Sequence, residues 1–84
     1  MNYSIIIPIY NEERILPRLL YELKSFEEEN EIIFIDDGSN DNSLKILKSN
    51  RNIKIIKLKK NLGKGVALRV GIKNSNYSKI IIFD

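Results

Sequence analysis

The sequence contains no cysteine and no histidine. Without cysteine the chain has neither disulfides nor thiolate metal sites, and without histidine it lacks the usual base for chemistry near neutral pH. Any bound metal must therefore be held by oxygen ligands. No apolar run approaches the roughly 20 residues of a membrane span, and no basic segment typical of a signal peptide is present, so we expect a cytoplasmic protein.

The composition is that of an ordinary globular protein, with 43% hydrophobic and 30% charged residues among 84. These proportions exclude a disordered tail and a low-complexity linker. The length allows one small domain, over residues 1–84, with a thin core.

The net charge of +3 conceals two halves of opposite charge. Residues 1–42 carry ten acidic and three basic side chains, whereas residues 43–84 carry eleven basic and one acidic. A basic half is compatible with nucleic acid, an anionic membrane surface or a phosphorylated ligand. No aromatic residue is interleaved with the lysines of 57–64, so the stacking platform of a single-strand binder is missing. We therefore expect no nucleic-acid partner and interpret these lysines as a solvated face.

Four short apolar runs rich in isoleucine predict four strands, over residues 3–9, 31–35, 52–58 and 79–83. The first, second and fourth runs are nearly continuous, which is typical of strands buried on both faces of a parallel sheet. The third alternates between apolar and basic residues and predicts an edge strand with one wet side.

The segments between the apolar runs predict three helices. The first carries an apolar stripe from Ile15 to Phe26, and Pro17 restricts its start to a point near Arg14 or requires an irregular turn before it. The second covers about residues 42–49 and is capped by Ser39 or Asp41. The third follows residue 63. Its expected buried face consists of Val66, Ala67 and Val70, and Gly71 allows close approach to the sheet.

The alternating order predicts an α/β fold, a Rossmann-like three-layer arrangement with a parallel sheet of four strands and three helices. Because an apolar run reaches Phe83 and a polar loop should follow it, we expect the chain to be part of a longer domain. The exposed edges of such a sheet also allow copies of the chain to pair with each other.

Ligands of open parallel sheets bind at the carboxyl ends of the strands. Three of the four segments that follow the predicted strands, 8–13, 36–41, 61–65 and Asp84, carry carboxylates, and all four are polar. The segments at the opposite edge, 27–30, 50–52 and 74–76, are typical of solvated turns. We therefore expect the functional site at the first edge.

Four motifs in this order resemble the amino-terminal, nucleotide-binding half of a family 2 glycosyltransferase of the GT-A fold. They are Ile7-Pro8-Ile9-Tyr10-Asn11-Glu12-Glu13, Ile35-Asp36-Asp37-Gly38-Ser39 with Asp41, Asn61-Leu62-Gly63-Lys64-Gly65 with Ala67 and Gly71, and Ile82-Phe83-Asp84. The resemblance covers the whole chain. Within the family, the first and third motifs are most similar to the polyprenyl-phosphate (dolichyl-phosphate) mannose or glucose synthases.

The resemblance implies that Pro8, Tyr10, Asn11 and Glu12 line the nucleotide pocket, with the ring of Tyr10 beside the base. The side chains are suited to this, because a tyrosine offers a flat face and a proline fixes the direction of the chain. A purely structural explanation is that Pro8 ends the strand and Asn11 caps a helix, and both explanations can hold together.

The resemblance also implies that Asp36 and Asp37 accept hydrogen bonds from the base or the ribose of the donor. Two adjacent carboxylates repel, and a turn needs only one, which favours a binding role. The alternative is an Asx turn with Gly38 at positive φ. In the third motif, Gly63 permits close approach of the backbone and Lys64 meets a phosphate; a flexible start of a helix with a solvated lysine is the alternative.

Asp84 corresponds to the first residue of an Asp-x-Asp motif whose carboxylates bind Mg²⁺ or Mn²⁺ in the family. An oxygen-ligated divalent cation neutralises the charge of a diphosphate leaving group. The second Asp of this motif is not in the sequence. The general base that inverting enzymes need comes from the later half of the family's domain.

The resemblance thus implies inverting transfer of a hexose from a nucleotide-diphosphate sugar to a lipid-phosphate or glycan acceptor, at the cytoplasmic membrane face for a full-length enzyme, with little turnover by these 84 residues alone. The alternative is a nucleotide-binding or oligomeric assembly module without catalysis. Rossmann dinucleotide domains, receiver domains and sugar nucleotidylyltransferases fit less well, because each places its glycines or acidic pair after the first strand, where this chain has residues 8–13.

Overall fold

A computed structural model describes residues 2–83, in which parallel strands alternate with helices. The elements are β1 (Ser4–Ile9), α1 (Leu16–Leu23), the 3₁₀ helix η1 (Lys24–Phe26), β2 (Glu31–Asp36), α2 (Ser43–Lys48), β3 (Lys54–Lys57), α3 (Lys64–Lys73) and β4 (Ile80–Ile82). The strand order is β3-β2-β1-β4, and every pairing is parallel. The predicted α/β fold class is confirmed.

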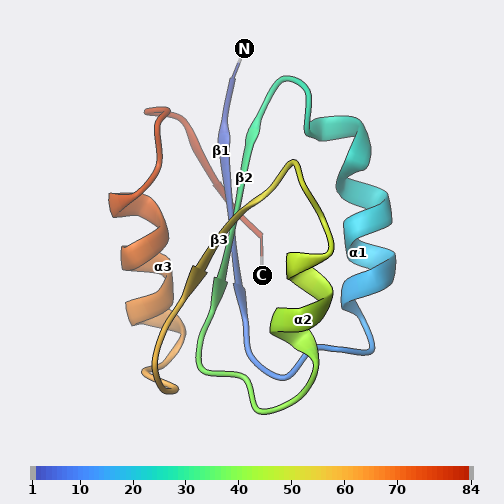
Figure 1. The fold of residues 1–84 in the computed structure, drawn as a ribbon. Coiled ribbons are helices and arrows are strands. Elements are labelled where there is room, and N and C mark those ends of the chain that lie inside the picture. Colours follow the sequence, from blue (N-terminus) through green and yellow to red (C-terminus); the bar gives the residue numbers. More distant parts are fainter. Residues whose placement is uncertain (1, 84) are drawn as a thin grey trace.

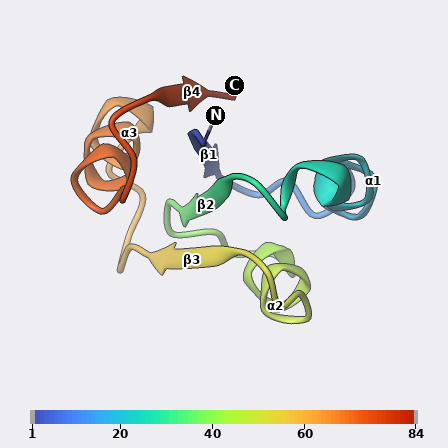
Figure 2. The same ribbon diagram turned by 90° about the horizontal axis from the view of Figure 1, so that it is seen from above.

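The sheet is the middle of three layers, with α3 on one face and α1 and α2 on the other (Figures 1 and 2). Successive residues of β1 and β2 contribute to opposite faces, as the period of a strand requires. Ile5, Ile32 and Phe34 belong to the core beneath α1 and α2, whereas Ile6 and Ile33 belong to the core beneath α3. This double coverage explains why both runs are continuously apolar.

The close packing of α3 depends on Gly71. A Cβ atom at this position would lie 2.5 Å from Cγ2 of Ile6 and 2.7 Å from Cδ1 of Ile35, so only glycine fits here without a shift of the core. Ala67 and Gly71 are buried against the sheet, as predicted. Val66 and Val70 are only half-buried, so placing them on the buried face was wrong: the buried residues of this helix are Ala67 and Gly71.

Edge position explains where the strand predictions succeed and fail. β3 is the predicted edge strand, with exposed Lys54 and Lys57 around two half-buried isoleucines. The expectation that the fourth run is buried on both faces was wrong, because Ile81 is 42% and Ile82 49% exposed. β4 is the outermost strand on its side within residues 2–83, and of its residues only Ile80 packs against the core beneath α3.

The start of α1 follows the second of the two predicted arrangements. The N–H groups of Ile15 and Leu16 both donate to the carbonyl of Glu12, which forms a turn before the regular helix begins at Leu16. Pro17 lies within the first turn, where its missing N–H costs nothing. Phe26, expected in the apolar stripe, is instead exposed in η1, because the chain tightens into a 3₁₀ turn after Leu23.

At the amino end of the sheet, the carboxylate of Glu31 joins several elements. It accepts hydrogen bonds from the Ser4 hydroxyl, the Asn76 N–H and the Asn76 side-chain amide, each at 2.7 Å, and lies 4.0 Å from the Lys54 ammonium. Burial alone raises the pKa of Glu31, but these donors and the Lys54 charge outweigh burial and hold the pKa below its ordinary value. The polar side chains around Glu31 therefore stabilise this edge of the sheet, which is consistent with its turn-like sequence.

We expect Gly71→Ala to lower the free energy of unfolding by about 1–3 kcal/mol, the usual cost of adding a methyl group to a filled core. Urea denaturation followed by circular dichroism measures this change. Gly65→Ala is the matched control on the same helix, because no atom lies within 4 Å of a Cβ built there. The control should be neutral or stabilising by up to about 1 kcal/mol. Equal effects of the two variants would contradict the packing role of Gly71.

Candidate functional site

The ends of the strands bring the predicted site segments to one edge of the sheet. Ile9 of β1 pairs in register with Asp36 of β2, which pairs with Lys57 of β3. The loops that follow these strands lie together at the lower end of the molecule in Figure 1. The parallel topology therefore brings segments 8–13, 36–41 and 61–65 close together, as predicted.

A cavity of about 350 Å³ opens between these loops. Of the predicted site residues, it is lined by Pro8, Tyr10, Glu12, Asp37, Gly63 and Lys64. Ile9 and Asn61 complete the lining. Asn11 and Asp36 do not line this cavity, and Asp84 lies outside the described residues.

Pro8 and Ile9 of β1 and Tyr10, which directly follows the strand, form one part of the cavity lining. Tyr10 is 44% exposed, so a ligand in the cavity can reach it. The structural explanation for Pro8 was wrong, because β1 continues to Ile9 rather than ending at the proline. Pro8 is tolerated in this central strand since the pairing of β1 with β4 ends before it, at Ile6 opposite Ile82.

Asp37 is almost completely buried, and its carboxylate binds the loop that precedes α3. Oδ1 accepts a hydrogen bond from the N–H of Leu62 (2.8 Å), and Oδ2 accepts from the N–H of Gly63 (3.0 Å) and from the side-chain amide of Asn61 (3.1 Å). The Asn61 amide also donates to the Asp37 carbonyl (3.2 Å). Gly38 has a φ of 73°, the positive value expected for it.

Asp36, its neighbour, shows the opposite behaviour. It is 1% exposed, and its Oδ1 has no hydrogen-bond partner within residues 2–83. A buried carboxylate oxygen without a donor is costly, so such an atom needs a reason to be there. Asp36 is thus the acceptor at this edge that the described part of the chain leaves unused.

Asn11 joins the first loop to the second. Its φ of 51° lies in the left-handed region, and its Oδ1 accepts hydrogen bonds from the N–H groups of Asn40 (2.7 Å) and Asp41 (3.3 Å). Its own N–H donates to the Ser39 hydroxyl (2.9 Å). The expectation that Asn11 caps a helix was wrong, because α1 begins only at Leu16 and this side chain is used by the neighbouring loop.

Asp41 and Ser43 add further bonds between the same two loops. Oδ2 of Asp41 accepts from the N–H of Glu13 (3.2 Å), and its Oδ1 accepts from the N–H of Ser43 at the start of α2 (2.9 Å). Burial raises the pKa of Asp41, but the donors from Ser43 and Glu13 hold it below its ordinary value. The Ser43 hydroxyl accepts from the N–H of Glu12 (2.9 Å). The prediction that Ser39 or Asp41 caps α2 was wrong, because the N-cap is Asn42; Asp41 instead accepts from the N–H of Ser43, the first residue of the helix.

Two participants escaped prediction as site residues. Asn61 lines the cavity and binds Asp37, and Ser43 fixes the backbone of Glu12. The Asn-x-Gly spacing before a helix was the available signal for Asn61. Nothing in the sequence around Ser43 distinguishes it from an ordinary first residue of a helix.

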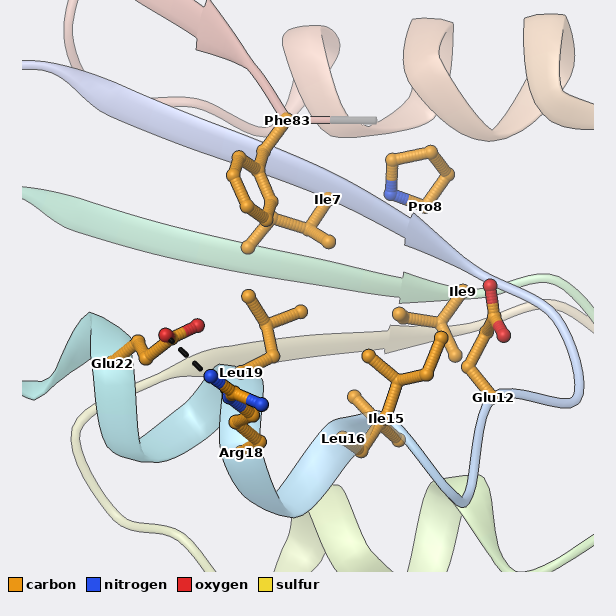
Figure 3. Close-up of a pocket in the computed structure, with 10 residues that line it drawn as sticks. All are labelled: Ile7, Pro8, Ile9, Glu12, Ile15, Leu16, Arg18, Leu19, Glu22 and Phe83. Atoms are coloured by element: carbon orange, nitrogen blue, oxygen red, sulfur yellow. Dashed lines mark ion pairs between the residues drawn. The ribbon is translucent and has the colours of Figure 1, made fainter.

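A second cavity, of about 310 Å³, lies between α1 and the end of β4 (Figure 3). Its walls are mainly apolar, with Ile7, Ile15, Leu19 and Phe83 pointing toward one another across it. Glu12 lines both this cavity and the one between the loops. The Arg18–Glu22 ion pair (3.7 Å) lies at its rim and is exposed.

The predicted metal site is not formed by the described part of the chain. Within residues 2–83, no three carboxylates come close enough to hold a metal ion together. Asp84, the predicted ligand, falls outside this range.

None of the helices in residues 2–83 has the length and apolar character needed to cross a membrane.

The sequence model described as glycosyl transferase family 2 matches residues 4–84. The chain belongs to this family. It is 39% identical to the undecaprenyl-phosphate 4-deoxy-4-formamido-L-arabinose transferase of Proteus mirabilis, over 96% of this chain and 28% of that protein. It is 35% identical to human dolichyl-phosphate beta-glucosyltransferase, over 96% of this chain and 30% of that protein.

The fold of this glycosyltransferase family 2 chain also matches a solved structure. The crystal structure of S. aureus TarS 1–349 in complex with UDP-GlcNAc superposes with a TM-score of 0.89 and 31% identity, over 100% of this chain and 26% of that one. The resemblance to the GT-A fold and to the polyprenyl-phosphate enzymes is thereby confirmed. The chain spans under a third of the length of these relatives.

We expect Asn11→Ala to destabilise the protein by about 2–3 kcal/mol. The variant loses two hydrogen bonds from backbone N–H groups. It also keeps a Cβ atom at positive φ but lacks the polar side chain that makes this conformation favourable for asparagine. Asn11→Gly is the matched control, since glycine adopts positive φ without strain. Urea denaturation should show the glycine variant to be more stable than the alanine variant by about 1 kcal/mol. Full stability of both variants would contradict the joining role of Asn11.

Proposed function

We propose that this chain forms the donor-binding part of an inverting glycosyltransferase, which transfers a hexose from a nucleotide-diphosphate sugar to a lipid-phosphate or glycan acceptor. The observation that carries the proposal is the cavity between the three loops, which combines an exposed tyrosine ring, a glycine and a lysine at the start of a helix. These are the groups needed to bind a base and a diphosphate. The UDP-GlcNAc complex of TarS supports a nucleotide sugar as the ligand.

The side chains have distinct roles in this proposal. The face of Tyr10 packs against the base, and Pro8 directs the chain so that the ring stays at the edge of the sheet. Asp37, which lines the cavity, accepts an N–H or O–H of the base or ribose, whereas Asp36 is buried and does not line the cavity. At the other end of the cavity, Gly63 leaves room for the diphosphate and Lys64 contributes positive charge. Asn11 and Glu12 hold and border the loop that carries Tyr10.

A divalent cation, Mg²⁺ or Mn²⁺, belongs to the proposal through the family resemblance, with Asp84 as one ligand. When bound, such a cation neutralises charge on the diphosphate. The described residues do not complete a metal centre, so the remaining ligands are not assigned to them.

The acceptor is proposed from the relatives. Undecaprenyl phosphate and dolichyl phosphate appear in the names of proteins that are 39% and 35% identical to this chain. A polyprenyl phosphate is therefore the first acceptor to test, and we propose that the full-length enzyme works at the cytoplasmic face of a membrane. The apolar cavity beside α1 is not assigned to this acceptor.

Isothermal titration calorimetry with UDP and with GDP, each with and without Mg²⁺, tests the donor site. We expect binding of at least one of the two, stronger with Mg²⁺, and a loss of about tenfold or more in affinity for Asp37→Asn, because a hydrogen bond to a charged acceptor contributes about 1.5–3 kcal/mol. Glu28→Gln, which removes an exposed carboxylate at the opposite edge, is the control and should leave the affinity unchanged. Absence of binding by the wild-type protein under all four conditions would reject the donor site.

A transfer assay tests how much of the reaction these residues support. Incubated with UDP-glucose or GDP-mannose, Mg²⁺ and a polyprenyl phosphate, the 84-residue chain should form no sugar-lipid above background while still binding nucleotide. The reason is that inverting transfer needs a general base, which the family resemblance assigns to a later part of the domain. Turnover at the rate of a full-length relative would show that residues 1–84 contain the base.

A further inference from the structure

The loop that carries Tyr10 is held by side chains of the segment that leads from β2 into α2. This loop lies between the end of β1 and the start of α1, so its N–H groups belong to neither element. Three consecutive N–H groups nevertheless find side-chain acceptors: Asn11 donates to Oγ of Ser39 (2.9 Å), Glu12 to Oγ of Ser43 (2.9 Å) and Glu13 to Oδ2 of Asp41 (3.2 Å). The backbone that directly follows Tyr10 is therefore fixed residue by residue.

The bonding between these two segments is reciprocal. Oδ1 of Asn11 accepts hydrogen bonds from the N–H groups of Asn40 (2.7 Å) and Asp41 (3.3 Å), and the carboxylate of Glu13 accepts one from the side-chain amide of Asn42 (3.2 Å). Six hydrogen bonds therefore join the two segments. Loops without regular structure are usually the most mobile parts of a fold, and these bonds give this loop a single conformation.

The three side-chain acceptors lie behind the cavity between the loops. Tyr10 and Glu12 line this cavity, whereas Ser39, Asp41 and Ser43 do not. Ser43 is completely buried, and it is the first residue of α2. These three residues can therefore influence a ligand in the cavity only through the loop that they hold.

We propose that Ser39, Asp41 and Ser43 are positioning residues of the donor site, which hold the Tyr10 ring where it packs against the base of the nucleotide. This role rests on the proposed donor site and extends it to residues that do not line the cavity. Without these acceptors the loop would have to be ordered when the nucleotide binds, and such ordering lowers the affinity. Because every base offers a flat face to an aromatic ring, UDP and GDP should be affected alike.

Nuclear magnetic resonance of the labelled protein tests this role, because it measures both amide exchange and weak nucleotide binding. Ser43→Ala removes the acceptor of the Glu12 N–H, and Ser39→Ala removes that of the Asn11 N–H, so exchange of the respective amide should accelerate about tenfold. In each variant the affinity for UDP and for GDP, with Mg²⁺ present, should fall about five- to tenfold. Ser49→Ala is the matched control, because the hydroxyl of Ser49 donates to the nearby carbonyl of Ile46 (2.7 Å). It should change neither quantity.

A double-mutant cycle with Tyr10→Ala separates the positioning of the ring from a general loss of stability. If Ser43 acts through Tyr10, Ser43→Ala should lower the affinity about five- to tenfold in the wild-type chain but less than about twofold in the Tyr10→Ala chain. A loss of the same size in both chains would overturn the role, because Ser43 would then affect binding without the ring. If Ser43→Ala does not fold, Ser39→Ala, at a half-buried position, provides the same comparison.

Two further results would overturn the positioning role. Unchanged exchange of the Asn11 and Glu12 amides in the serine variants would show that these acceptors do not hold the loop. Faster exchange with unchanged nucleotide affinity would show that the loop is held but that binding does not depend on it. Failure of the wild-type protein to bind either UDP or GDP would instead reject the proposed donor site itself, so the two failures are distinguishable.

Discussion

Backbone N–H groups that belong to no helix or strand decide the shape of the candidate site. Where a parallel strand ends, the chain turns away and its next N–H groups lose their ladder partners, so they need other acceptors. Here the acceptors are side chains: Asn11 receives two loop N–H groups, Asp37 receives two, and Asp41 receives one from the loop and one from Ser43 at the start of α2. The cavity between the loops has the form it has because these acceptors fix its walls.

The fold was predictable because its signals are local and strong. Continuous isoleucine runs identify the two central strands, and the Lys54 to Lys57 alternation identifies an edge. The fourth run carries the same signal as the first, yet its outer residues are exposed. A continuous apolar run predicts that a strand is covered on both faces. Within the described residues, β4 lies at the edge of the sheet and is not covered in this way. From the sequence alone, the exposed apolar residues of β4 cannot be distinguished from the buried apolar residues of β1.

Which residues line the candidate site was largely predictable, but the hydrogen bonds between them were not. Topology alone brings Tyr10, Glu12 and Lys64 to one cavity, because all parallel strands end at the same edge. The use of each carboxylate and amide was not predictable, since it depends on which loop N–H groups arrive within hydrogen-bond distance. Asn11, expected to cap its own helix or to line the pocket, is used by the loop 28–30 residues further along the chain.

Strand alternation gives a physical reason why neighbouring aspartates can differ so much. Asp36 follows Ile32 and Phe34 on the side of β2 that faces α1 and α2, so by the period of two the carboxylate of Asp37 turns toward the side of α3. On that side the chain supplies N–H donors from residues 62 and 63; on the other, the described residues supply none to the Asp36 Oδ1 atom. Of the two neighbouring aspartates, Asp37 therefore accepts hydrogen bonds from the backbone of the loop before α3. The Oδ1 atom of Asp36 keeps no hydrogen-bond partner within the described residues. The Asp-Asp-Gly motif thus combines a carboxylate that holds the loop before α3, a buried carboxylate with an unpaired oxygen and a close-packed glycine.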